Sequence, residues 1–90
     1  MLENFAELLG ILATIFGICM SLAYFPQVYK IYKRKSSADV SILTFSAFLV
    51  GLIVWLLYGI SISNLPLIIA NAVGVIGASA VIAVCLYYRK

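Results

Sequence analysis

Tyr24-Phe25-Pro26-Gln27 places a proline and an uncharged amide near the end of the first long apolar run of the sequence. Proline lacks the backbone N–H that would reach the carbonyl of Leu22, and its ring clashes with that carbonyl, so a helix crossing this stretch must bend or leave the carbonyl exposed. The stretch is therefore a candidate hinge, beyond which residues 29–34 could swing at little further cost. Prolines also kink membrane helices without any role in function, and the residues alone leave both interpretations open.

The composition of the chain is that of an integral membrane protein. Of its 90 residues, 66% are hydrophobic and only 10% are charged. A soluble domain of this size exposes too much surface to hide so many apolar side chains. The basic residues lie at the ends of apolar runs, where lipid headgroups would meet them, so the net charge of +3 does not indicate nucleic-acid binding.

The apolar pattern predicts one all-α membrane domain over residues 1–90. Its three spans are expected at about 5–33, with the kink at Pro26, at about 42–60 and at about 65–88, each long enough to cross a bilayer. The acidic N-terminus, with Glu3 and Glu7, argues against a signal peptide. Cys19 and Cys85 lie in apolar segments of a chain without histidine, so we expect packing residues and no metal or cofactor.

Short polar residues and charges predict the helix ends and the topology. Asp39 or Ser41 should cap the second span and Asn64 the third. Pro66 lies in the first turn of the third span, where its missing backbone N–H costs nothing because the helix has no acceptor for it there. Alternating spans place all six basic residues on one side of the membrane: Lys30, Lys33, Arg34, Lys35, Arg89 and Lys90. By the positive-inside rule that side is cytoplasmic, which leaves the N-terminus and Asn64 outside a bacterial plasma membrane and puts the Lys30–Ser41 loop and the C-terminus inside.

Small residues at four-residue spacing in the first and third spans predict a tight bundle, because they let helix backbones approach closely. They are Ala13, Gly17 and Ser21, and Ala70, Gly74 and Ala78. Three close-packed helices enclose no solute path, so a transport function needs at least two copies. A parallel homodimer is the simplest closed arrangement.

Two side chains stand out within the spans, Trp55 in the second and Asn71 in the third. Each lies roughly 7.5 Å inward from the shared outer loop. Gly51 and Gly59 are expected to clear space beside the indole. An indole that stacks on a sugar ring, together with an amide that binds hydroxyls, suits a neutral polyhydroxylated ligand. The alternative is that Asn71 joins helices and Trp55 fills the core.

Several motifs together resemble the bacterial SemiSWEET sugar transporters of the PQ-loop family, over essentially the whole chain. They are Phe25-Pro26-Gln27, the linker ending Ser36-Ser37-Ala38-Asp39-Val40-Ser41, Trp55-Leu56-Leu57-Tyr58-Gly59, Asn64-Leu65-Pro66 and Ile69-Ala70-Asn71. The resemblance implies a parallel homodimer of three-helix bundles, with the third helix between the other two, that moves sugars such as glucose or sucrose by alternating access. It also implies that Trp55 and Asn71 contact the sugar.

The resemblance implies gate residues as well. Pro26 and Gln27, with Phe25 beside them, would act at the hinge and inner gate. Tyr58 matches an outer-gate tyrosine that in some relatives is partnered by an arginine and an aspartate. Here those charged positions read Ile62 and Asn64, so an outer gate would close through Tyr58 packing and uncharged hydrogen bonds, with Asn64 contributing.

No Asp, Glu, Lys, Arg or His occurs within residues 11–29, 42–60 or 65–88. Nothing in the spans can therefore carry a proton or balance a driven ion, so we expect passive uniport. An enzyme is disfavoured because the chain has no buried carboxylate pair and no nucleophile beside a base. A carrier of another small neutral solute, such as an amino acid, and a non-transporting assembly subunit remain alternatives.

Overall fold

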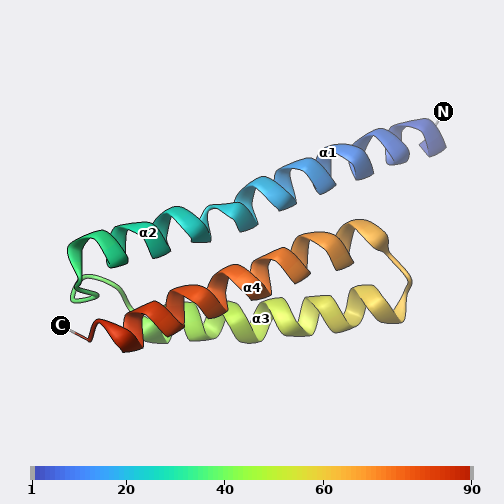
Figure 1. The fold of residues 1–90 in the computed structure, drawn as a ribbon. Coiled ribbons are helices and arrows are strands. Elements are labelled where there is room, and N and C mark those ends of the chain that lie inside the picture. The colour runs from blue at the N-terminus through green and yellow to red at the C-terminus, as the bar shows by residue number, and fades with distance from the viewer. Residues whose placement is uncertain (1, 90) are drawn as a thin grey trace.

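The computed structural model describes residues 2–89 and contains four helical segments. They are α1 (Leu2–Leu22), α2 (Tyr24–Arg34), α3 (Ile42–Ser61) and α4 (Leu65–Tyr87). Because α1 and α2 form one nearly continuous segment, the described residues contain three helical stretches that are long and apolar enough to cross a membrane (Figure 1). The all-helical architecture with three such helices, predicted from hydropathy, is confirmed.

The chain forms a flat layer of helices with α4 in the middle. α4 packs against α3 on one side and against α1 and α2 on the other (Figure 1). The layer measures 53 × 22 × 14 Å, so its thinnest dimension is little more than one helix. Most of the buried helix residues belong to α4, whereas large apolar side chains on the other helices stay exposed.

Small residues allow α4 to approach its neighbours closely. A methyl group added at Gly17 would lie 2.9 Å from Cβ of Ala70, and one added at Gly77 would lie 2.7 Å from Cβ of Tyr24. Real Cβ contacts are longer, so neither position has room for a larger residue. The close packing predicted for Gly17 and Ala70 is confirmed. Ala13 differs, because it is exposed and lines a cavity of about 300 Å³ where α1 diverges from α4.

The bend expected near Pro26 lies at Ala23, between α1 and α2. The Ala23 N–H donates to the carbonyl of Met20 at 3.2 Å, a tighter turn than the α-helical one. Pro26 is the third residue of α2, and its ring would clash with the carbonyl of Leu22, one turn back. The proline therefore displaces the break by about one turn toward the N-terminus.

α2 is anchored to the C-terminal half of α4. Ile31 is fully buried and packs with Val81 and Cys85. In the linker after α2, the buried Ser37 hydroxyl lies 3.0 Å from the Cys85 carbonyl and 2.7 Å from the Tyr88 carbonyl, and the Ser37 N–H donates to the latter. This corrects the expectation that residues 29–34 swing at little cost, because moving α2 alone would expose Ile31 and break these bonds.

The helix starts follow the predicted caps, with one exception. The Thr44 N–H donates to the Ser41 hydroxyl at 3.1 Å at the start of α3, and the Leu67 N–H donates to Oδ1 of Asn64 at 3.2 Å at the start of α4. Asp39, the other candidate cap for α3, instead pairs with Arg34 at 2.8 Å.

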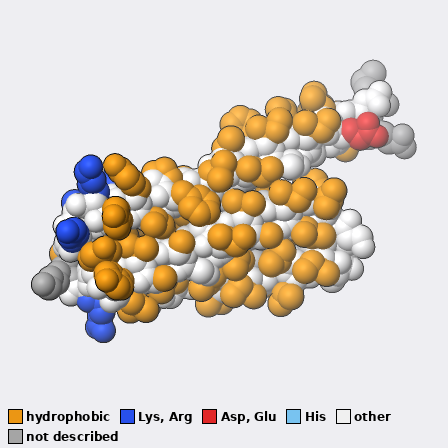
Figure 2. Space-filling model, in the orientation of Figure 1, with side chains coloured by type: hydrophobic (Ala, Val, Ile, Leu, Met, Phe, Trp, Pro, Cys, Tyr) orange, Lys and Arg blue, Asp and Glu red, His pale blue; other side chains and the backbone are white. Residues whose placement is uncertain are grey.

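Basic side chains gather at one end of the layer, where α2 ends, the linker runs and α4 ends (Figure 2). Acidic atoms appear at the opposite end, near the N-terminus. Lys90, the last of the predicted basic residues, lies outside the described part of the chain. The charges are therefore segregated along the helix axes, as a membrane-spanning layer requires.

Replacing Gly77 by Ala should destabilise the fold by about 1–3 kcal/mol, since the new methyl group overlaps Tyr24. Gly10→Ala is the matched control, because nothing lies within 4 Å of a Cβ at that helical position. The midpoint of thermal unfolding in detergent, followed by circular dichroism, should fall for Gly77→Ala and stay level or rise for Gly10→Ala. Equal midpoints for the two variants would contradict the close approach of α2 to α4.

Candidate functional site

A cavity of about 250 Å³ lies over α4, between side chains of α1 and α3 and next to the break at Ala23. Its lining comes from the end of α1, the start of α2, the middle of α3 and the first half of α4: Gly17, Met20, Ser21, Tyr24, Leu52, Ala70 and Asn71. Small residues on α1 and α4 keep this space open while holding the two helices together. It is mostly apolar, with few polar groups, as small-molecule sites usually are.

Asn71 is the principal polar group of the cavity. Its Nδ2 donates to the carbonyl of Leu67 at 2.8 Å, one turn back on α4. This bond orients the amide and leaves its carbonyl oxygen and second N–H without a partner among the described residues. Asn71, predicted as a ligand-binding residue, thus lies in a cavity with hydrogen-bonding capacity to spare.

Ser21 joins the two helices beside Asn71. Its hydroxyl donates to the carbonyl of Ala70 at 2.8 Å, and its side chain is buried. From its spacing Ser21 was expected only as a small packing residue. Spacing along α1 does not show which carbonyl of a neighbouring helix its hydroxyl reaches, so this bond carries no signal in the sequence.

An aromatic cluster lies beside the cavity, between α2 and α3. Tyr24 packs edge-to-face on Phe45, with ring centroids 6.0 Å apart, and Phe45 packs likewise on Phe48 at 5.7 Å. Tyr24 also covers Gly77, well along α4 toward its C-terminus. These rings occupy the space between the cavity and the basic end of the layer.

Trp55 does not line this cavity. It lies on α3 with 54% of its surface exposed, and its ring packs edge-to-face on Tyr58 at 5.8 Å. Gly51 borders open space, as expected, but Gly59 packs against Leu67 of α4 and clears no room for the indole. The single chain therefore does not bring Trp55 and Asn71 together in one cavity.

The remaining predicted site residues lie nearer the two ends of the layer. Toward the basic end, Phe25 is exposed, Pro26 is in the first turn of α2, and Gln27 lines a separate basic hollow. Toward the opposite end, Tyr58 is half exposed beside Trp55, and Oδ1 of Asn64 is engaged in capping α4. Asn64 therefore has mainly its NH₂ group free for other contacts.

The ionised groups of the described chain lie away from this cavity. Arg34 holds the pKa of Asp39 below its usual range, chiefly through their side-chain hydrogen bond, so this exposed carboxylate stays ionised at neutral pH. Within residues 4–89, whose side chains the structure describes, no three His, Cys, Asp or Glu side chains gather as metal ligands would. What the cavity offers is hydrogen bonding and apolar contact for a neutral ligand.

Residues 7–90 match a family described as "Sugar efflux transporter for intercellular exchange". The chain belongs to the SWEET family of sugar transporters. Its SWEET-family relatives include the sugar transporter SemiSWEET of Bradyrhizobium diazoefficiens, 37% identical over 70 residues that cover 78% of this chain and 81% of that protein. SemiSWEET of Leptospira biflexa is 32% identical over 69 residues, covering 77% of this chain and 76% of that protein.

A solved structure described as a bacterial homologue of SWEET transporters shares the fold. It is similar to this chain with a TM-score of 0.84 at 34% identity, covering 90% of this chain and 98% of that one. The resemblance inferred from the sequence motifs is thereby confirmed. The SWEET family is one of transporters, which sets the enzyme alternative aside at the level of the family.

Proposed function

We propose that this chain is a passive sugar uniporter that works as a parallel homodimer by alternating access. The observation that carries the proposal is the Asn71 amide, held with spare hydrogen-bonding groups in an uncharged cavity of a SWEET-family chain. The transported class is neutral mono- or disaccharides, such as glucose or sucrose. The basic end of the layer faces the cytoplasm of a bacterial cell, and the N-terminus lies outside.

The flatness of the protomer supports the dimer. A layer about one helix thick has no inside through which a solute could pass, and its exposed apolar side chains include Trp55 and Tyr58. A second copy facing the first would place two Asn71 cavities and two Trp55 rings around one central path. The indoles then stack on the sugar ring while the amides bind its hydroxyls.

Alternating access requires one end of the dimer to open while the other closes. The break at Ala23 divides each protomer into an outer part, in which α1 packs on the first half of α4, and an inner part, in which α2 packs on the second half. The inner gate combines Phe25, Pro26 and Gln27 with the ring of Tyr24. The outer gate uses Tyr58 and the NH₂ group of Asn64.

Proteoliposomes containing the protein should take up labelled glucose or sucrose until inside and outside concentrations are equal. An imposed pH or sodium gradient should not change that end point, because no Asp, Glu, Lys, Arg or His lies within residues 11–29, 42–60 or 65–88. Accumulation of sugar above the outside concentration would rule out uniport. Uptake of alanine without uptake of either sugar would favour a carrier of another neutral solute.

Asn71→Ala should reduce sugar flux at least about tenfold. Each hydrogen bond lost to a desolvated hydroxyl costs roughly 1 kcal/mol, and the amide is lost from both subunits of the dimer. Trp55→Ala should act similarly through lost stacking area, while Trp55→Phe keeps part of the flux. Leu57→Ala is the control, because this residue is equally exposed on α3 but points about 200° away around the helix. Normal flux through stable, dimeric Asn71→Ala or Trp55→Ala protein would place the site elsewhere.

Pro26→Ala should restore the N–H that reaches the Leu22 carbonyl, straighten the α1–α2 segment and favour one conformation. A bias of about 1.4 kcal/mol depopulates the other conformation tenfold, which slows the cycle without preventing assembly or sugar binding. Pro66→Ala is the matched control, because a proline at a helix start interrupts no hydrogen bond. Flux is compared at equal reconstituted amounts, and an unchanged rate for Pro26→Ala would make the proline a structural kink only.

A further inference from the structure

An open hollow of about 540 Å³ lies at the basic end of the layer, apart from the Asn71 cavity. Five of its lining residues come from α2 and one from the linker that follows: Gln27, Tyr29, Lys30, Lys33, Arg34 and Asp39. None of them lines the cavity that holds Asn71. The proposed sugar-binding residues, Trp55 and Asn71, therefore lie outside this hollow, and Gln27 of the proposed inner gate is the one residue that the two proposals share.

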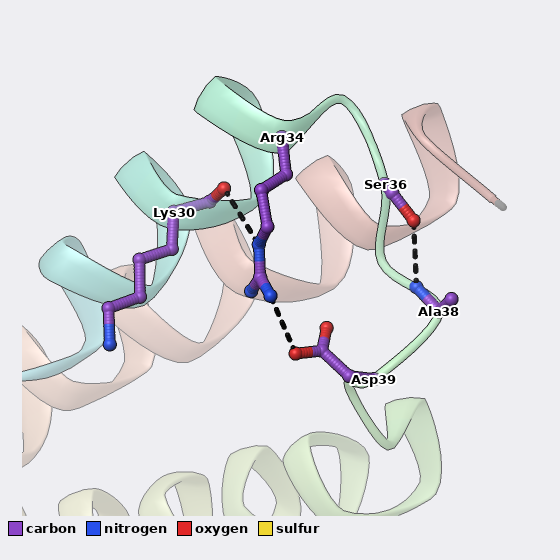
Figure 3. Close-up of polar contacts among 5 residues, drawn as sticks. All are labelled: Lys30, Arg34, Ser36, Ala38 and Asp39. Carbon is purple, nitrogen blue, oxygen red and sulfur yellow. Dashed lines mark hydrogen bonds and ion pairs between the residues drawn. The ribbon is translucent and has the colours of Figure 1, made fainter.

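The hollow carries excess positive charge. Its only carboxylate, Asp39, is engaged by Nη1 of Arg34 at 2.8 Å, and Nε of Arg34 reaches the Lys30 carbonyl at 3.5 Å (Figure 3). The remaining acidic residues of the chain, Glu3 and Glu7, belong to the start of α1, at the other end of the layer. The ammonium groups of Lys30 and Lys33 thus have no carboxylate partner within the described residues.

Helix α2 holds the cations of the hollow on one side. Lys30, Lys33 and Arg34 follow the three- and four-residue spacing that places side chains on one side of a helix. Nζ of Lys33 lies 5.9 Å from the ring centroid of Tyr29, within cation–π range. Since α2 is fixed on α4 through Ile31, the hollow is formed in advance of any ligand.

The position of the hollow matches the depth of lipid headgroups. Tyr29 and Tyr32 are each 59% exposed on α2, and Tyr32 packs against Tyr88 just beyond the end of α4. Exposed tyrosines beside basic residues at the end of an apolar span mark the membrane–water interface. A soluble anion needs only the charges, whereas a lipid also uses the apolar surface that adjoins them.

We propose that this hollow binds the phosphate of an anionic phospholipid headgroup, with Lys30 and Lys33 as its ion-pair partners. The Gln27 amide and the Tyr29 hydroxyl supply hydrogen bonds to the rest of the headgroup. Arg34 remains paired with Asp39 and shapes the wall of the site. The proposal concerns lipid binding and holds whichever solute the protein carries.

The test compares two double variants of the protein in detergent. Lys30→Gln with Lys33→Gln removes two charges from the hollow. Lys35→Gln with Arg89→Gln is the control, because it removes two charges from the same end of the layer but from a different place. Lys35 and Arg89 line a separate hollow of about 430 Å³, together with Tyr87 and Tyr88. Circular dichroism and dimer size confirm the fold of each, and binding of fluorescent phosphatidylglycerol is measured against its phosphatidylcholine analogue.

The unmodified protein should prefer phosphatidylglycerol. The Lys30 and Lys33 variant should bind it roughly 30-fold more weakly, at about fivefold per lysine, whereas the Lys35 and Arg89 variant should stay within about threefold because of ionic screening. If lipid binding weakens equally in both variants, or weakens in neither, the proposed site is wrong. The lipid is then attracted by the diffuse charge of the surface. Displacement of the lipid by equimolar inorganic phosphate at constant ionic strength would overturn the assignment to a lipid.

Discussion

The close approach of α4 to its neighbours is the constraint on which the rest of the structure depends. In lipid, helices gain little from apolar burial against one another, so van der Waals packing between backbones must hold them together. Gly17 against Ala70 and Gly77 against Tyr24 provide that packing, and both contacts would be lost with a larger residue. The same small residues leave the space that becomes the Asn71 cavity. The small side chains therefore serve both the stability of the helix packing and the formation of the cavity.

The break at Ala23 divides this packing into two parts. α1 contacts the first half of α4, and α2 contacts the second half, where the Ser37 hydroxyl ties the following linker to the Cys85 carbonyl of α4 and to the Tyr88 carbonyl just after it. A proline hinge alone would let α2 move by itself, but Ile31 and Ser37 attach it to α4. In the proposed cycle, α2 and the C-terminal half of α4 consequently move as one body, and the aromatic rings between α2 and α3 move with them.

Local chemistry explains which features could be predicted from the sequence. The helical spans follow from hydropathy, and the caps at Ser41 and Asn64 follow from a polar side chain placed just before an apolar run. Asn71 stood out because an amide is rare at that depth. Contacts between distant residues could not be read in the same way. The roles of Ser21 and Ser37 and the packing of Gly59 on Leu67 depend on which neighbour each helix meets.

The central claim is that the Asn71 amide binds the transported sugar, and its side-chain NMR signals test this most directly. The chain has three asparagines, Asn4, Asn64 and Asn71, so selective ¹⁵N labelling gives few side-chain resonances to follow. During titration with glucose or sucrose, the Asn71 signals should shift to saturation, while those of Asn4, which lies near the start of α1 and outside the proposed site and gates, stay in place. Asn71 signals that do not move at sugar concentrations saturating transport would contradict the account.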